Sequence, residues 1–207
     1  MIDTREKIIV KALALFNEQG IEYVGMRELA AALGMRIGNI TYYFPTKDHL
    51  VFSLSERYTA SNTAIHEAHT VVGLCDFLEK AEVLYTNSLR YRSLVLSMVH
   101  LMEQNRMMAD QYEETKDVRK KGLARSIKTL VENKFLKAHT HEDQWFLVSS
   151  NSLINRFWMS EAAVSGKRHT VENQIGHYLK LLAMLFKPYA TKKGLDDISR
   201  FLERLRP

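Results

Sequence analysis

Residues 26–47 read MRELAAALGMRIGNITYYFPTK, and this stretch decides how the chain is organised. Its apolar residues recur at three- and four-residue steps for two helical turns, and Gly34 then allows the left-handed backbone that a sharp turn needs. A second short helix, predicted over about 37–44, ends before Pro45. Two short helices joined by a glycine turn are the layout of a helix-turn-helix. Helices of two turns do not persist alone in water, so another helix has to hold them in place.

The flanking sequence predicts one helix on each side of this motif. Asp3 and Glu6 have the spacing of a capping box, and an amphipathic pattern follows until Gly20. After the motif, Thr46 can cap a fourth helix that extends over about 47–69. We expect the first helix to pack the motif and the fourth to lead into the rest of the chain.

The chain of 207 residues has the composition of a helical protein. It is 46% apolar and 26% charged, with three prolines and nine glycines, and alternating β-branched runs are missing. Further helices are predicted over about 74–90, 93–105, 110–136, 142–164, 170–187 and 195–205. The expected fold is all-α, with an N-terminal three-helix helix-turn-helix domain, 1–50, joined by the long fourth helix to a C-terminal helical bundle, 51–207.

Membrane-spanning and secreted proteins are not expected classes for this sequence. The longest apolar run, residues 181–186, is far shorter than the roughly 20 residues that a membrane span requires. The N-terminus has no signal-peptide pattern. We therefore expect a cytoplasmic protein without a membrane partner.

Catalytic and metal-binding motifs are also missing from the sequence. The single cysteine, Cys75, has apolar neighbours and no base placed to activate it, so we expect a buried core residue. The pair His66 and His69 lacks the spacing of a HExxH zinc site, and His139 and His141 are expected in a loop. We expect neither an enzyme nor a bound cofactor or metal.

The order LAAALGM..GNITYYFPTKDHL at residues 29–50, behind an amphipathic helix that ends at Gly20, closely resembles the DNA-binding domain of the TetR family of bacterial transcriptional regulators. The resemblance covers about residues 4–55. It implies a ligand-responsive regulator, commonly a repressor, that binds a pseudo-palindromic operator in double-stranded DNA as a homodimer. Two positions depart from the family pattern: Arg36 stands where a capping Ser or Thr is common, and Thr41 where an aromatic is frequent.

The outward side of the second motif helix carries groups that can read duplex DNA. Asn39 can pair with an adenine edge, Thr41 offers a hydroxyl and a methyl group, and the two tyrosines that follow can reach the sugar-phosphate backbone. The predicted DNA-binding residues are Arg27, Arg36, Asn39, Thr41, Tyr42, Tyr43 and Lys47. Either tyrosine could instead belong partly to the core, and Arg27 or Lys47 could serve only its own helix.

The distribution of charge does not by itself point to DNA. The chain has a net charge of +5, but residues 1–50 hold six Lys/Arg and six Asp/Glu. The basic excess lies in residues 113–128 and 187–207, each with six basic and three acidic residues. These segments keep a second interpretation open, a helical adaptor or membrane-surface protein without sequence-specific DNA binding.

A homodimer is expected because one helix-turn-helix makes too few phosphate contacts for tight specific binding. In the family that the chain resembles, the two C-terminal helices pair with those of a second copy as a four-helix bundle. The predicted interface residues are Val148, Leu153, Phe157, Ile175, Tyr178, Leu182 and Leu185. These residues could also be plain core of one chain.

The resemblance also implies a pocket for a small-molecule effector in the C-terminal bundle. The predicted lining combines aromatic, methionine and amide side chains: Phe77, Tyr85, Met98, Met102, Tyr112, Trp145, Asn151, Asn155 and Trp158. Ordinary core packing is the alternative for each of them. The fourth helix belongs to both parts of the chain, so we expect it to carry the effector signal to the motif.

Overall fold

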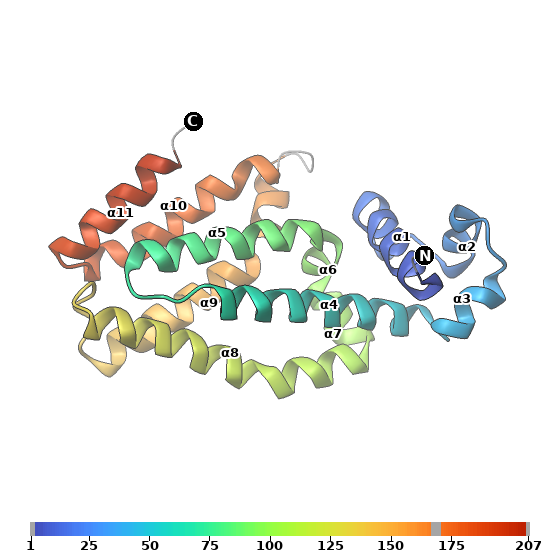
Figure 1. Ribbon diagram of the computed structural model, residues 1–207, viewed down its shortest axis with the longest axis horizontal. Coiled ribbons are helices and arrows are strands. Elements are labelled where there is room, and N and C mark those ends of the chain that lie inside the picture. The colour runs from blue at the N-terminus through green and yellow to red at the C-terminus, as the bar shows by residue number, and fades with distance from the viewer. Residues whose placement is uncertain (1–2, 167–170, 206–207) are drawn as a thin grey trace. The chain divides into compact units, whose positions relative to one another are not determined.

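The computed structural model describes residues 3–166 and 171–205, and their regular structure is helical (Figure 1). The helices are α1 (Thr4–Gln19), α2 (Met26–Leu33), α3 (Ile37–Tyr43), α4 (Lys47–Ala68), α5 (Leu74–Arg90), α6 (Arg92–Leu96), α7 (Met98–Gln104), α8 (Arg106–Glu132), α9 (His141–Ser165), α10 (Ile175–Phe186) and α11 (Lys192–Arg204), with the short 3-10 turns η2 (Glu172–Gln174) and η3 (Lys187–Tyr189). In this part of the chain the only β pairing is an isolated antiparallel bridge between Leu136 and Ala190. None of the helices within the described ranges is long and apolar enough to cross a bilayer. The prediction of an all-α fold is confirmed.

The chain divides into two compact units. Unit 1 comprises Met1–Ser61 and Ser88–Tyr112, and unit 2 comprises Asn62–Asn87 and Glu113–Pro207. Helices α4, α5 and α8 each contribute residues to both units. The predicted boundary after residue 50 separates functions rather than compact units, and it stays a prediction.

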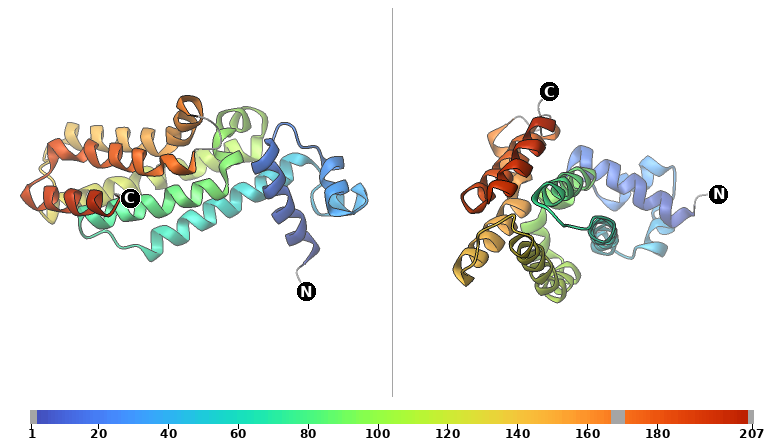
Figure 2. Two further views of the ribbon diagram at one scale, coloured as in Figure 1. Left: turned by 90° about the horizontal axis from the view of Figure 1, so that it is seen from above. Right: turned by 60° about the vertical axis from the view of Figure 1, so that its left-hand side comes forward.

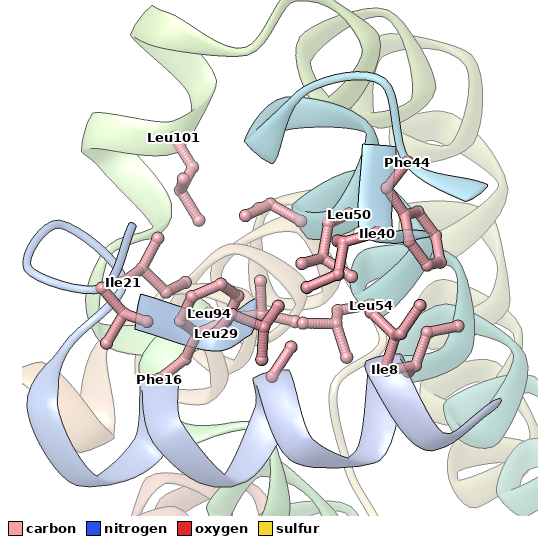
Figure 3. Packing of buried hydrophobic residues seen from close by; sticks show 14 of the residues in the cluster. Ile8, Phe16, Ile21, Leu29, Ile40, Phe44, Leu50, Leu54, Leu94 and Leu101 are labelled. Atoms are coloured by element: carbon pink, nitrogen blue, oxygen red, sulfur yellow. The ribbon is translucent and has the colours of Figure 1, made fainter. Parts of the chain in front are cut away.

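The core of unit 1 is a single apolar cluster in which α1 holds the two short helices α2 and α3. Phe16 of α1, Leu29 of α2 and Ile40 of α3 are buried together (Figure 3). Helices α6 and α7 add Leu94 and Leu101 to the same cluster. The sequence did not predict this second contribution, because a contact between distant segments leaves no local periodic pattern.

The caps predicted for α2 and α4 are present in the structure, whereas the one predicted for α1 is not. Gly34 ends α2 in the left-handed region with φ of 63°, and the Thr46 hydroxyl caps α4 by accepting a first-turn backbone N–H at 3.4 Å. Asp3 occupies the N-cap of α1, but its side chain makes no capping hydrogen bond. The predicted capping box is wrong, because the carboxylate of Glu6 pairs with Arg57 of α4 instead.

Several of the predicted helices have different bounds, and the last of them begins at Lys192 instead of about residue 195. The predicted helix 93–105 is divided into α6 and α7, because the backbone at Ser97 has φ −89° and ψ 7° and closes the first of them. Helix α8 begins earlier than predicted, at Arg106, where Asn105 Oδ1 accepts the N–H of Met108 at 3.3 Å. It ends at Glu132, before the predicted end at 136. The predicted start at Thr170 lies outside the described residues.

In unit 2, α10 packs against α9, and α11 runs beside α5 (Figures 1 and 2). Asp197 of α11 is buried, and its Oδ2 accepts the backbone N–H of Cys75 at 2.9 Å. Further along, Arg204 forms ion pairs with Glu79 at 2.8 Å and with Glu82. Cys75 is buried, as predicted. The last helix is therefore an integral part of unit 2.

Candidate nucleic-acid interface

Helix α3 turns one face to the core of unit 1 and the other to solvent. Ile40 and Phe44 are 0% and 1% exposed and anchor the helix (Figure 3). Arg36, Asn39 and Tyr42 lie on the other side and are exposed. The major groove accepts one helix with outward polar groups, and α3 presents such a face.

The two tyrosines of α3 have different environments. Their rings are perpendicular, with centroids 5.1 Å apart. Tyr42 is 81% exposed, whereas Tyr43 is half-buried and packs against the apolar cluster of unit 1. The ring of Tyr42 is therefore accessible to a ligand, and Tyr43 combines a core contact with its place on the recognition helix.

The two departures from the family pattern have distinct local roles. Arg36 occupies the N-cap of α3 without a capping hydrogen bond from its side chain, so its exposed guanidinium remains available to phosphate or base edges. Thr41 is half-buried, and its hydroxyl donates back to the carbonyls of Ile37 at 3.3 Å and Gly38 at 3.4 Å. These bonds leave the methyl group as the part of Thr41 that faces away from its own backbone.

The two predicted phosphate-binding cations differ in exposure. Arg27 is exposed in the first turn of α2, whereas Lys47 is half-buried with its Nζ 5.9 Å from the centre of the Phe16 ring. Burial lowers the pKa of Lys47, and the nearby carboxylate of Glu22 opposes that shift. For Glu22, burial acts to raise the pKa, but a hydrogen bond from Ser97 and nearby positive charges lower it overall. The negative charge of Glu22 therefore offsets part of the effect of burial on Lys47.

Two asparagines that the sequence analysis did not single out join α1 and α4 to later helices of unit 1. Asn17 Nδ2 donates to the carbonyl of Arg90 at 2.8 Å, and its Oδ1 accepts the N–H of Ser93 at 3.1 Å. Asn105 Nδ2 donates to the carbonyl of Asp48 at 3.0 Å. Because the partners are far apart in the chain, no local sequence pattern marks either asparagine.

The residues predicted to line an effector pocket fall in both units. Met98, Met102 and Tyr112 belong to unit 1, where Met102 packs against the apolar cluster. In unit 2, Phe77 makes an edge contact with Phe186 at a centroid distance of 5.2 Å. Phe77 and Met102 contribute to the cores of their own units, whereas Met98 and Tyr112 are half-buried.

Four other predicted pocket residues meet inside unit 2, and we call them the Asn151 cluster: Tyr85, Asn151, Asn155 and Trp158. The Tyr85 hydroxyl donates to Asn155 Oδ1 at 2.8 Å, and Asn155 Nδ2 donates to Asn151 Oδ1 at 2.7 Å. The rings of Tyr85 and Trp158 stack with centroids 4.7 Å apart and planes 10° apart. Trp145 is 57% exposed and lies outside this cluster.

The residues predicted for a dimer interface also differ in exposure. Val148, Tyr178 and Leu182 are buried within one chain, and Ile175 and Leu185 are half-buried. Leu153 and Phe157 are 59% and 37% exposed on α9. The first three side chains thus serve the core of the chain itself, and the last two offer apolar surface to a partner.

Comparison with known families now identifies the chain. The model of bacterial regulatory proteins of the tetR family matches residues 8–54, and the model of the TetR bacterial transcriptional repressors matches residues 55–198. The chain belongs to the TetR family. It is a transcriptional regulator, and the sequence resemblance is confirmed. TetR-family regulators bind DNA and small-molecule ligands, act as dimers and are not enzymes.

One curated relative and two solved structures are similar to the chain. The probable HTH-type transcriptional regulator YttP of Bacillus subtilis (strain 168) is 36% identical over 62 residues, which cover 28% of this chain and 30% of that protein. A TetR-family transcriptional regulator from Marinobacter aquaeolei VT8 matches over 100% of both chains with a TM-score of 0.88 and 18% identity. SmeT, the repressor of the Stenotrophomonas maltophilia multidrug efflux pump SmeDEF, matches over 92% of each chain with a TM-score of 0.64 and 14% identity. At these identities the structural matches establish the fold.

Proposed function

We propose that this TetR-family regulator is a repressor that binds a pseudo-palindromic operator as a homodimer and releases it when a small molecule binds to unit 2. The observation that carries the proposal is the two-sided α3, with Ile40 buried and with Arg36, Asn39 and Tyr42 exposed. Its site of action is the cytoplasm, where the bacterial chromosome lies. We propose a repressor and not an activator because repression is the commoner mode in the family.

In this proposal the exposed groups of α3 divide between the DNA backbone and the bases. Asn39 reads an adenine edge in the major groove, and Tyr42 donates its hydroxyl to a phosphate. Arg27 and Lys47 lie at the starts of α2 and α4, where backbone N–H groups add to their attraction for phosphate. Arg36 and Thr41 set which operator is preferred, since they are the positions that differ from the family pattern.

The homodimer is supported by an apolar stripe along α9. Phe146, Leu153, Phe157 and Val164 follow one another at steps of seven, four and seven residues, which places them on one face of the helix. Their side chains are 43%, 59%, 37% and 85% exposed, respectively. A second copy can cover this stripe with its own α9, because a two-fold axis brings the same patch of both chains together.

Effector binding is transmitted, in this proposal, by the helices that contribute to both units. Helix α4 carries Asp48, whose carbonyl is held by Asn105, and α5 ends at Arg90, whose carbonyl is held by Asn17. A displacement of either helix strains one of these hydrogen bonds and changes the position of α1 or α4 in the DNA-binding unit. The spacing of the two recognition helices in the dimer then no longer fits the operator.

Selection of binding sites from random duplexes with the purified protein tests the proposal. We expect an enriched pseudo-palindrome whose half-sites lie about one helical turn apart, and an affinity that falls steeply with salt. If the selected pool shows no palindrome and the protein instead binds anionic vesicles, the proposal is overturned in favour of the membrane-surface alternative. Effector response is measured separately, as operator release on addition of ligand.

A further inference from the structure

The Asn151 cluster places an unusual set of polar groups inside unit 2. Asn151, Asn155 and Trp158 follow one another at steps of four and three residues on α9, so their side chains share one face of that helix. This face meets Tyr85 of α5. The hydrogen bonds run in one direction, from Tyr85 to Asn155 and from Asn155 to Asn151.

Two donors of the cluster have no acceptor. Asn151 Nδ2, at the end of the hydrogen-bond chain, and Trp158 Nε1 are both without a hydrogen-bond partner among the described residues. Asn151 is 0% and Trp158 2% exposed, so solvent does not supply the missing acceptor. Folded proteins pair nearly all of their buried polar groups, and two unpaired donors on one helix face point to a ligand.

The surroundings of the two donors define the chemistry of that ligand. The four side chains of the cluster are uncharged, and the pKa of Tyr85 is raised by burial alone. Burial and the negative charge of Glu161 raise the pKa of Tyr178. An anionic ligand would lose its hydration beside uncharged side chains and near Glu161, and a cation would face two N–H donors, so a neutral molecule fits better. Trp158 also lies 5.7 Å from the ring of Tyr178, which adds a second aromatic neighbour. Flat molecules suit such a site because they stack on aromatic rings.

The spacing of the donors indicates the size of the ligand. Asn151 and Trp158 are two helical turns apart, about 10 Å along the axis of α9. Two acceptor groups set apart on one molecule can pair with the two donors at the same time. The ligand therefore carries two acceptor groups near opposite ends of its body.

We propose that Asn151 and Trp158 are the specificity-determining donors of the effector site, and that the effector is a flat, uncharged organic molecule with carbonyl or ether oxygens at two ends. The inference rests on the effector response proposed above. It is narrower than that proposal, because it names the side chains and the class of ligand. Binding of the effector inserts its body beside Trp158 and displaces the stacked ring of Tyr85.

The hollow of about 320 Å³ between the start of α5 and α11 is a less suitable effector site. Its lining includes charged groups that already have partners. Asp197 accepts from Cys75 and from Arg200, and Lys193 lies 3.8 Å from the centre of the Phe135 ring. This hollow therefore offers few free polar groups to a neutral ligand.

Titration calorimetry on the full-length protein without DNA tests the class of ligand. The probes are 4′-methoxyflavone, which is neutral and has oxygens at both ends, 2-phenylnaphthalene, which has a similar shape without oxygen, and flavone-4′-carboxylate, which is charged. We expect 4′-methoxyflavone to bind with a Kd below about 100 µM and the other two at least about tenfold more weakly. If 4′-methoxyflavone binds no better than 2-phenylnaphthalene, the inference is overturned.

Two variants test the assigned side chains. Asn151→Leu removes an unpaired donor at nearly constant volume, and it leaves Asn155 able to bond with water because Asn155 is exposed. We expect the melting temperature of the unliganded protein to stay level or rise, while affinity for 4′-methoxyflavone falls about tenfold or more. Trp158→Phe, which keeps an aromatic ring without the N–H, should weaken binding in the same way.

Asn133→Leu is the matched control, because Asn133 donates to the carbonyl of Val72 at 2.8 Å and takes no part in the Asn151 cluster. Its ligand affinity should remain that of the unaltered protein. A lower melting temperature with unchanged ligand affinity in both Asn151→Leu and Trp158→Phe would show that the two side chains are structural. Failure of the operator selection would leave these calorimetric results standing, so the two proposals fail separately.

Discussion

Asn17 on α1 and Arg90 at the end of α5 are joined by a hydrogen bond of 2.8 Å from the asparagine Nδ2 to the arginine carbonyl. Asn17 also accepts the N–H of Ser93 through Oδ1 at 3.1 Å, and its own carbonyl accepts from Arg92 Nε at 2.8 Å. One residue thus ties the α5–α6 junction to the first helix of the DNA-binding unit. Since Tyr85 lies in the same helix as Arg90, a displacement of α5 by a ligand is expected to reach α1 through Asn17.

Substitution of Asn17 should loosen this junction in a graded way. Asn17→Ala removes both side-chain hydrogen bonds, and Asn17→Asp keeps an acceptor for the N–H of Ser93 but loses the donor to Arg90. We expect Asn17→Ala to reduce the free energy of unfolding by about 1–2 kcal/mol and Asn17→Asp by less. In hydrogen exchange, the Ser93 amide should exchange faster in Asn17→Ala than in Asn17→Asp. Equal protection of that amide in the two variants would contradict the assigned bond.

The two tyrosines of α3 should separate DNA binding from stability. Tyr42 is 81% exposed, so Tyr42→Ala should weaken operator binding about tenfold and leave the melting temperature within about 1 °C. Tyr43 packs against the core, so Tyr43→Ala should also lower the melting temperature by several degrees. Fluorescence anisotropy with the selected operator and thermal denaturation measure the two effects. If Tyr42→Ala binds the operator as tightly as the unaltered protein, Tyr42 is not part of the DNA interface.

The DNA-binding motif could be predicted from sequence because its determinants are local. Gly34, Pro45 and the spacing of apolar residues fix where α2 and α3 begin and end. The same logic failed at Glu6, because its partner Arg57 comes from another helix and competes with the local capping bond. The role of Asn17 could not be predicted for the same reason, because its hydrogen-bond partners lie in α5 and α6.

The C-terminal helices could be located from sequence, but their buried and exposed faces could be assigned only in part. Asn151 and Trp158 are buried on one face of α9, whereas Leu153 and Phe157 remain exposed. All four belong to one helix whose apolar residues lie on more than one side, so periodicity alone does not show which side is turned inward. The packing of α9 against α10 and α5 determines which side of α9 is buried.

The ion pair between Glu6 and Arg57 should make stability depend on pH in the acid range. The hydrogen bond from Arg57 lowers the pKa of Glu6 below its ordinary value of 4.5, although burial opposes the shift. A carboxyl with a lowered folded-state pKa contributes stability above its unfolded value and loses it as the pH falls through the folded value. Glu6→Gln should therefore lower the melting temperature by about 1–2 °C at pH 7, and this effect should become smaller as the pH falls toward about pH 3.

Glu18→Gln is the control for this ion pair, because Glu18 is exposed on the same helix. It should leave the melting temperature unchanged at both pH values. A Glu6→Gln effect of the same size at about pH 3 as at pH 7 would mean that the pair does not cause it.

Replacement of Gly194 and of Gly122 by alanine should change the free energy of unfolding in opposite directions. A Cβ at Gly194 would lie 2.2 Å from the carbonyl oxygen of Phe135, so Gly194→Ala has to displace backbone and should cost about 2–4 kcal/mol of stability. A Cβ at Gly122 meets nothing within 4 Å in the exposed middle of α8, so Gly122→Ala should add about 0.5–1 kcal/mol. Urea denaturation of both variants measures the difference. Unchanged stability of Gly194→Ala would contradict the close approach of α11 to Phe135, in the segment that follows α8.

Interruption of the apolar stripe on α9 should dissociate the proposed dimer. Leu153 is 59% exposed at the middle of the stripe, so Leu153→Arg places a charge where two copies of α9 would meet, and desolvating that charge opposes association. Val118→Arg is the matched control, because Val118 is an apolar residue that is 69% exposed on α8, outside the stripe. Light scattering after size-exclusion chromatography should give a dimer for the unaltered protein and for Val118→Arg, and a monomer for Leu153→Arg. The monomer should also lose operator affinity, because a single half-site contact remains. A dimer that persists in Leu153→Arg would place the interface on another face of the chain.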